Sequence, residues 1–268
     1  MKLASPAKIN LFFRVLSKRA DGYHEIETLL QAIDLFDTLL IEPHSKDLFS
    51  CSDPRLPLDE TNLVIRALSL FRKRYSFDMP LRIHLEKRIP MEAGLGGGSG
   101  NAATLLWGIN LLAGRVATSL ELSALGAELG SDVPFFFSTG TAYCSGRGEH
   151  VASLAAMRGE GWLAIPPFRL STRQVYETLR IDALDMQNVW RNDLESAAFS
   201  LAPKLSLFKD WLNGFRFDRV AMTGSGSAFF CFGPSRRLDS SFIPFRFAQR
   251  SPEGWYTQND SRIGEKHF

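Results

Sequence analysis

Cysteine is scarce in this chain: its 268 residues include only Cys51, Cys144 and Cys231. Their odd number and wide spacing, without a C-x-x-C pair, argue against a disulfide framework and against a zinc site. Such cysteine usage is typical of proteins kept in a reducing compartment, so we expect a cytoplasmic location.

Long apolar runs and an excess of one charge are also missing. No apolar stretch approaches the ~20 residues that cross a bilayer. Lys8, Asn10 and Arg14 interrupt the apolar N-terminal segment, which argues against a signal peptide. The 31 Lys and Arg residues nearly balance the 29 Asp and Glu residues, whereas nucleic-acid binders normally carry a basic patch or stripe. We therefore expect neither a membrane nor a nucleic-acid partner.

Strand and helix patterns follow one another without a regular alternation, which favours an α+β fold. Strands are predicted at residues 8–16, 25–35, 38–42, 81–87, 135–137, 141–145, 162–165, 219–223 and 228–232. Helices are predicted at residues 62–75, 101–113, 120–129, 172–179, 193–199 and 203–211. The polar tail after Gly254 is expected to be loosely held.

The strongest chemical signal is a glycine-rich segment at residues 90–104, PMEAGLGGGSGNAAT, between a predicted strand and a predicted helix. Glycine permits positive φ and lets a ligand approach the main-chain amides closely. The start of the following helix offers unpaired N–H groups and the positive end of the helix dipole. A flexible linker or a sharp turn is the alternative, but the strand–loop–helix context favours a site for phosphate oxygens.

The common nucleotide-binding motifs do not occur in this segment. No G-K-[ST] follows the glycines, so it is not a Walker A loop. The spacing also differs from the G-x-G-x-x-G of dinucleotide-binding folds and protein kinases.

The segment resembles the phosphate loop of the GHMP kinases, whose signature Pro-x-x-x-Gly-Leu is matched by Pro90, Gly94 and Leu95, with a serine at Ser99. Residues 5–11, SPAKINL, resemble the first motif of that family, and residues 222–228, MTGSGSA, resemble the third. The resemblance implies a two-lobed GHMP kinase fold. An N-terminal lobe like domain 2 of ribosomal protein S5 would span residues 1–158, and a ferredoxin-like C-terminal lobe residues 159–268.

Residues 19–24, RADGYH, and 130–134, GSDVP, narrow the resemblance to the branch that acts on a cytidine diphosphate-linked methylerythritol. This implies a small-molecule kinase of the non-mevalonate isoprenoid route that transfers the γ-phosphoryl group of ATP to a 2-hydroxyl. Mg²⁺ is expected with ATP. Ser99 is the only candidate protein ligand, so no metal site is assigned. We expect a monomer or a weak homodimer.

Two residues carry the implied chemistry. By itself, Asp132 two residues before a proline is more often a turn or helix-cap residue, and a strand lysine such as Lys8 is more often solvated. The resemblance instead implies that Asp132 is the general base and that Lys8 lies beside it. Before three phenylalanines, the Asp132 carboxylate should be partly desolvated and therefore a better base.

The remaining roles also come from the resemblance, and each of these residues could instead be structural. Asn10 would orient the substrate, His24 would bind the edge of cytosine, and Tyr23 and Tyr176 would flank its ring, with Thr172 nearby. ATP would contact Pro90, Gly94, Leu95, Gly96, Gly97, Gly98, Ser99, Asn101, Asn62 and Lys87. Asn192 or Asp193 is expected to cap the helix at 193–199.

Two other functions remain open at this point. One is a GHMP kinase acting on mevalonate or homoserine, and the other is a nucleotide-binding relative without catalysis. The Asp-Gly-Tyr-His segment favours a cytidine-bearing substrate over the first, and the presence of Lys8 and Asp132 gives no support to the second. Gly100 stands where the family commonly has a second serine, which puts one phosphate or metal contact in doubt.

Overall fold

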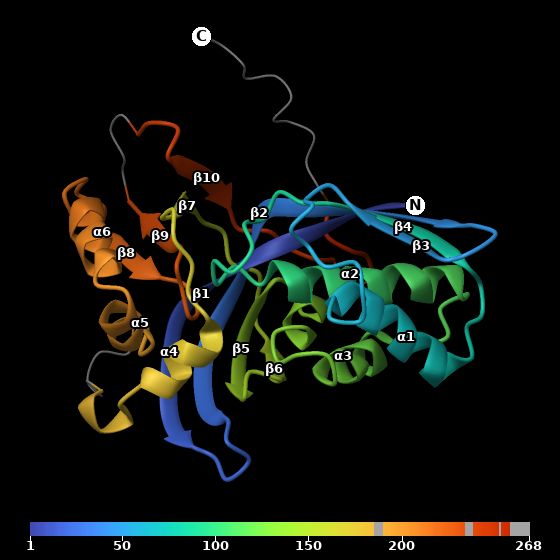
Figure 1. Ribbon diagram of the computed structural model, residues 1–268, viewed down its shortest axis with the longest axis horizontal. Coiled ribbons are helices and arrows are strands. Elements are labelled where there is room, and N and C mark those ends of the chain that lie inside the picture. Colours follow the sequence, from blue (N-terminus) through green and yellow to red (C-terminus); the bar gives the residue numbers. More distant parts are fainter. Residues whose placement is uncertain (185–189, 234–237, 252, 258–268) are drawn as a thin grey trace.

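Two β-sheets with helices packed against them make up the computed structural model, which describes residues 1–184, 190–233, 238–251 and 253–257 (Figure 1). The six α-helices and ten strands of this described part confirm the expected α+β class. No helix among the described residues is long and apolar enough to cross a membrane.

The first sheet is built around two long antiparallel strands, β1 (Lys2–Lys18) and β2 (His24–Pro43). Strand β2 also pairs with β4 and β5, so it occupies the centre of the order β3-β4-β2-β5-β6. The other strands are shorter: β3 (Leu48–Cys51), β4 (Leu81–Glu86), β5 (Thr141–Gly146) and β6 (His150–Ser153).

Helices α1 (Leu63–Tyr75), α2 (Gly97–Leu112) and α3 (Ser119–Ala127), with the 3₁₀ helix η1 (Pro134–Phe137), pack on this sheet and share one hydrophobic core with it. Local signals explain two helix starts. The Asn62 side chain accepts a hydrogen bond from the Val64 N–H at the start of α1. Thr118 and Glu121 form a capping box at α3.

The second sheet, ordered β10-β7-β9-β8, is antiparallel throughout. Within β9, Phe229 and Cys231 point into a core shared with the helices, whereas Phe230 points into a core shared with the first sheet, as the two-residue period of a strand requires. The elements of this half are β7 (Glu160–Ala164), α4 (Thr172–Thr178), η2 (Ile181–Ala183), α5 (Glu195–Leu201), α6 (Lys204–Asn213), β8 (Arg219–Met222), β9 (Phe229–Phe232) and β10 (Phe242–Arg246).

Strand β1 runs between the two helical groups, with α1–α3 on one side and α4–α6 on the other (Figure 1). Its residues Ala7, Ile9 and Leu11 pack against the second sheet, and Phe13 and Val15 join the core under α4–α6. The chain passes from the first sheet to the second between β6 and β7. The division into domains at residues 158 and 159 stays a prediction.

Several boundaries differ from the sequence prediction. Residues 25–35 and 38–42 belong to one continuous strand, β2, and residues 135–137 form η1 rather than a strand. A short apolar run cannot be assigned from periodicity alone, and Pro134 at the first position favours a helical start. Helix α2 begins at Gly97 rather than at residue 101, because low glycine propensity hid its first turn. The short strands β3, β6 and β10 were not predicted.

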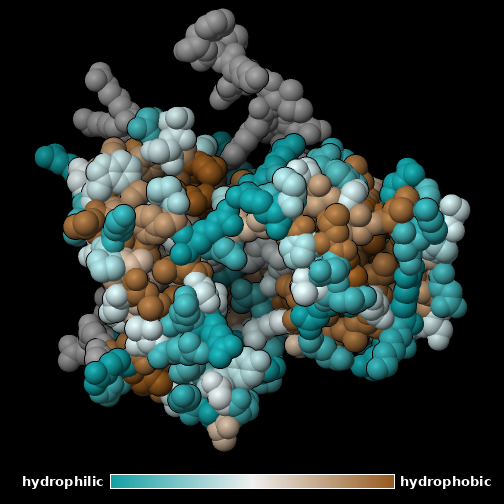
Figure 2. Space-filling model, viewed as in Figure 1, coloured by the Kyte–Doolittle hydropathy of each residue, from teal (hydrophilic) through white to brown (hydrophobic). Residues whose placement is uncertain are grey.

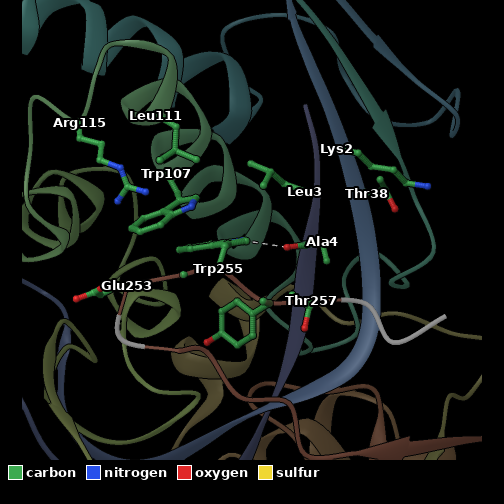
Figure 3. Close-up of a pocket in the computed structure, with 12 residues that line it drawn as sticks. Lys2, Leu3, Ala4, Thr38, Trp107, Leu111, Arg115, Glu253, Trp255 and Thr257 are labelled. Carbon is green, nitrogen blue, oxygen red and sulfur yellow. Dashed lines mark hydrogen bonds between the residues drawn. The ribbon is translucent and has the colours of Figure 1, made fainter. Parts of the chain in front are cut away.

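The segment after Gly254 is better held than expected as far as the structure describes it. Trp255 and Tyr256 are buried, and the Trp255 ring stacks on Trp107 of α2 with ring centroids 5.3 Å apart. Figure 3 shows the Trp255 indole N–H donating to the carbonyl oxygen of Ala4, at 2.9 Å, beside a pocket between α2 and β1. Residues 258–268 lie outside the described residues.

Replacing Trp255 by alanine should therefore destabilise the whole fold, although it lies near the end of the chain. We expect the free energy of unfolding to fall by ~3–5 kcal/mol, the usual loss for a buried aromatic side chain. Chemical denaturation measures the change. Leu120→Ala is the control, because Leu120 is 80% exposed and its loss should matter little. A Trp255→Ala variant as stable as the Leu120→Ala variant would contradict this expectation.

Candidate active site

A cavity of about 1140 Å³ lies between the start of α2 and α4. Figure 2 shows this face of the molecule hollowed between the α1–α3 half and the α4–α6 half, with hydrophilic residues in the hollow. Every residue assigned to catalysis or binding from the sequence lines this cavity, with the single exception of Asn10. Residues scattered from Lys8 to Tyr176 are thus brought to one place.

The glycine-rich loop ends in an exposed helix start. Gly96 precedes α2 with φ 67°, a conformation that glycine adopts without strain. Gly97, Gly98 and Ser99 form the first turn of α2. Their N–H groups have no acceptor within the helix. These three amides lie on the cavity wall and form an amide cradle suited to an anion.

Lys8 and Asp132 lie together beside this cradle. The Lys8 ammonium nitrogen is 3.6 Å from Oδ2 of Asp132. The Lys8 side chain is 4% exposed, whereas the Asp132 side chain is 40% exposed, so the carboxylate is only partly withdrawn from water. A Cβ atom added to Gly96 would lie 2.8 Å from Cγ of Lys8, so the lysine stem packs directly on the loop.

The third glycine motif completes the surroundings of Lys8. It forms the turn between β8 and β9, and a Cβ atom added to Gly224 would lie 3.2 Å from the Lys8 ammonium nitrogen. The Thr223 hydroxyl donates to the main-chain oxygen of Gly94 at 3.3 Å. The Lys8 N–H donates to the main-chain oxygen of Leu95 at 2.9 Å. Three motifs far apart in sequence therefore meet around one ammonium group.

Asn10 lies behind Lys8 rather than on the cavity wall. Its Oδ1 accepts a hydrogen bond from the Lys8 ammonium group at 2.7 Å, which places both side chains on one face of β1 as predicted. Its Nδ2 donates to the Thr28 hydroxyl at 2.9 Å. The side chain is 2% exposed. Asn10 therefore orients Lys8, and a direct contact of Asn10 with a substrate has no support in this geometry.

Aromatic side chains gather at the α4 end of the cavity. The rings of His24 and Tyr176 stack on each other with centroids 5.1 Å apart, so they are already in contact and leave no room for a third ring between them. Tyr23 is 55% exposed, and the Arg147 guanidinium lies 4.9 Å from its ring centroid. One face of Tyr23 is thus covered by Arg147 and one face of Tyr176 by His24, and both tyrosines line the cavity. The Thr172 hydroxyl hydrogen-bonds to the Ser225 hydroxyl at 2.8 Å.

Asn62 and Lys87, the predicted ATP contacts outside the glycine-rich segment, line the cavity and also make structural contacts. Asn62 caps α1 and donates to the main-chain oxygen of Pro57. Lys87 forms a buried ion pair with Asp37, which the sequence analysis did not single out. Asp193 does not cap a helix, because α5 begins at Glu195. Its carboxylate instead accepts from the Val15 N–H and pairs with Arg191.

Sequence reasoning missed two cationic residues near Tyr23, namely Lys18 and Arg147, which both line the cavity. Neither belongs to a recognised motif, and a lone basic residue after a strand gives no signal in the sequence. Arg147 pairs with Glu149, and the three other arginines on the wall also have a carboxylate partner: Arg55 with Asp53, Arg169 with Glu92 and Arg173 with Glu177.

Burial and nearby charge shift several titrations in the site. Partial burial lowers the pKa of His24, and the positive charge of Lys18 adds to this effect. Burial raises the pKa of the Tyr176 hydroxyl, and the Asp132 carboxylate contributes. Burial together with Asp132 also raises the pKa of the Cys144 thiol to about 12. His24 is therefore neutral at pH 7, and neither Tyr176 nor Cys144 ionises there.

Comparisons with known proteins agree with this geometry. The model of the GHMP kinases N terminal domain matches residues 62–140. The 4-diphosphocytidyl-2-C-methyl-D-erythritol kinase of Protochlamydia amoebophila is 48% identical over 269 residues, covering 96% of this chain and 93% of that protein. A crystal structure of 4-(cytidine 5'-diphospho)-2C-methyl-D-erythritol kinase is 31% identical with a TM-score of 0.78, covering 92% of this chain and 99% of the other. A homoserine kinase from Cytophaga hutchinsonii shares the fold alone, at 17% identity and a TM-score of 0.67, covering 88% and 85% of the two chains.

The imidazole of His24 should titrate below its ordinary pKa of 6.5, as its burial and Lys18 require. An NMR titration of the ring measures this pKa, and Lys18→Gln should move it upward. With its pKa lowered in the folded state, His24 binds a proton more readily in the unfolded chain than in the folded one. His24 therefore stabilises the fold fully only above pH 6.5. This contribution is lost as the pH falls through the folded-state pKa. A titration midpoint above 6.5 would refute the assignment.

Proposed function

Because the chain belongs to the GHMP kinase family, and within it to the 4-diphosphocytidyl-2-C-methyl-D-erythritol kinases, we propose that it phosphorylates the 2-hydroxyl of 4-diphosphocytidyl-2-C-methyl-D-erythritol with ATP. This reaction would serve the non-mevalonate route to isoprenoids. The observation that carries the proposal is the position of Lys8 and Asp132, 3.6 Å apart, in one cavity with the amide cradle and the Tyr23–His24 pair.

ATP would bind with its phosphates on the amides of Gly97, Gly98 and Ser99, because the helix start supplies unpaired N–H groups and a positive dipole end. The described residues contain no cluster of three or more His, Cys, Asp or Glu side chains that could hold a metal. Mg²⁺ in kinases typically binds few protein ligands together with substrate phosphates. Ser99, on the cavity wall, fits that arrangement and would hold the ion through its hydroxyl, and the ion would offset negative charge on the β- and γ-phosphates.

The acceptor hydroxyl would lie beside Asp132. The partly exposed carboxylate of Asp132 would accept the hydroxyl proton as the oxygen attacks the γ-phosphorus, and the bond from that phosphorus to the β–γ bridging oxygen would break, with ADP as the leaving group. Lys8 lies close to the first turn of α2 and to Asp132, so its ammonium group offsets negative charge on the transferring phosphoryl group. Asn10 holds Lys8 in that position through the 2.7 Å hydrogen bond. Proton removal and charge stabilisation are thus carried by neighbouring side chains.

The cytosine would bind at the aromatic end of the cavity. Neutral His24 has one ring nitrogen that donates and one that accepts, which suits the mixed hydrogen-bonding edge of cytosine. Tyr23 and Tyr176 supply ring faces for stacking, which contributes substantially to recognition of single bases. Lys18, opposite His24 in the β1–β2 ladder, would offset charge of the diphosphate that joins the base to the alcohol, and Arg147, which also pairs with Glu149, would add to it.

The proposal is tested by the choice of acceptor. ADP release from MgATP should occur with the cytidine diphosphate-linked alcohol. It should be at least ~10²-fold slower, in kcat/KM, with free methylerythritol, mevalonate or homoserine, because the hydrogen bonds of the base to His24 and its stacking on the tyrosine rings are then lost. Phosphorus NMR should show the new phosphomonoester on the 2-hydroxyl. Turnover that ignores the cytidine group would indicate a different GHMP kinase, and ATP binding without turnover would indicate a non-catalytic relative.

Asp132→Asn should lower kcat by ~10²–10⁴, the scale for loss of a general base, while the KM for ATP changes little. Steady-state kinetics on the folded variant measure both constants. Asp210→Asn is the matched control, because Asp210 is an exposed residue of α6 and does not line the cavity. Unchanged turnover in Asp132→Asn would remove the general base from this mechanism.

A further inference from the structure

Asp37 lies outside every motif of the sequence and is fully buried, with 0% exposure. It sits on β2 where pairing with β4 ends, since the last pair is Thr38 with Glu86. Beyond that pair, the Asp37 side chain replaces the main-chain hydrogen bonds of the strand. Its Oδ1 accepts hydrogen bonds from the N–H groups of Arg88 at 2.7 Å and Ile89 at 2.8 Å. The main chain that enters the glycine-rich loop is therefore fixed by a carboxylate.

The second oxygen of the same carboxylate contacts the other end of the loop. Oδ2 of Asp37 accepts a hydrogen bond from Nδ2 of Asn101 at 3.0 Å, and Asn101 lies in α2, just after the amide cradle. It also pairs with the Lys87 ammonium group. One side chain of β2 thus ties together the entry to the loop, the helix that follows it and a cation on the cavity wall.

The position of Lys87 gives this arrangement an electrostatic role. A Cβ atom added to Gly97 would lie 3.3 Å from the Lys87 ammonium nitrogen, so the charge lies against the first residue of α2. The Lys87 side chain is only 6% exposed. The helix start already carries a partial positive charge, and a second buried positive charge would be repelled from it. The Asp37 carboxylate offsets this repulsion and keeps Lys87 beside the cradle.

We propose that Asp37 is a positioning residue for nucleotide binding. It sets the relative position of the two ends of the glycine-rich loop, and it holds the Lys87 ammonium group where it adds positive charge to the amide cradle. The phosphates of the nucleotide, rather than its base, should therefore depend on Asp37. The inference rests on the proposed function only for the identity of the ligand as ATP.

Asp37→Asn tests the proposal with almost no change of shape. The asparagine oxygen still accepts from the N–H groups of Arg88 and Ile89, but its NH₂ group faces the donors of Lys87 and Asn101 and cannot accept from them. Titration calorimetry should show ATP affinity reduced ~10-fold or more, since a charge-assisted hydrogen bond is lost. ADP should lose less, and adenosine should bind as in the wild type. In kinetics, the KM for ATP should rise while the KM for the alcohol stays within ~3-fold.

Asp193→Asn is the matched control. Asp193 is also buried, at 3% exposure, also accepts a main-chain N–H, from Val15 at 2.8 Å, and also pairs with an arginine, Arg191, but it does not line the cavity. It should lower thermal stability as Asp37→Asn does, yet leave the ratio of ATP to adenosine affinity unchanged. If both variants change that ratio equally, or if neither does, Asp37 is only a structural residue and the proposal is overturned.

A second variant keeps the test decisive if Asp37→Asn does not fold. Asn101→Ala removes the tie to α2 and leaves the Asp37–Lys87 pair intact. Asn101 lines the cavity but is only 2% exposed, so its side chain offers little direct contact to a ligand. ATP affinity should fall by ~3-fold or more, a partial loss for one hydrogen bond, with adenosine affinity constant. An equal loss for both ligands would overturn the proposal. These titrations need no acceptor alcohol, so a wild type that binds ATP but ignores the cytidine-linked alcohol would reject the proposed function while this result stands.

Discussion

The buried ammonium group of Lys8 is the interaction on which the site depends. A lysine side chain that is 4% exposed is strongly unfavourable unless its charge is compensated. The compensation comes from Asn10 at 2.7 Å and from Asp132 at 3.6 Å. Gly96 and Gly224 both approach the lysine so closely that a Cβ atom on either would crowd it. Two glycines in motifs more than a hundred residues apart are therefore explained by the space around one side chain.

The same geometry divides the cavity into two ends with different chemistry. At the α2 end the binding groups are mainly main-chain amides, which carry no net charge and cannot be protonated near neutral pH. At the α4 end they are side chains, namely the aromatic rings of Tyr23, His24 and Tyr176. Asp132 lies between these ends and is 40% exposed, so water reaches the carboxylate in the ligand-free enzyme and must leave when an alcohol binds.

The sequence identified the motif residues that line this cavity, but not the residues that hold them in position. Gly94, Ser99, Lys8 and Asp132 were identified because their motifs are local and recur in one family. Asp37 was not identified, since its partners come from a different strand and a helix, and no spacing in the sequence reveals a long-range carboxylate. Arg147 was missed for the same reason, because its contact with Tyr23 exists only once β5 pairs with β2.

The errors in the predicted secondary structure have a similar cause. The first turn of α2 was not predicted because glycine disfavours helices, yet Gly97 lies so close to Ile89 that a Cβ atom there would be only 3.0 Å from it. The phenylalanine run at residues 135–137 was assigned to a strand by intrinsic preference, but buried contacts on all sides override that preference. Tertiary packing decided both segments, and both adjoin the cavity or the core beneath it.

Strand β1 contributes to two cores that also contain side chains of the second sheet, with Ala7, Ile9 and Leu11 in one and Phe13 and Val15 in the other. A fragment beginning at residue 159 would lack these five side chains and would expose the apolar surfaces that they cover. Cutting the chain at that point would therefore separate the second sheet from side chains that complete its cores. A split or circularly permuted version would have to carry the first strand along with the C-terminal half.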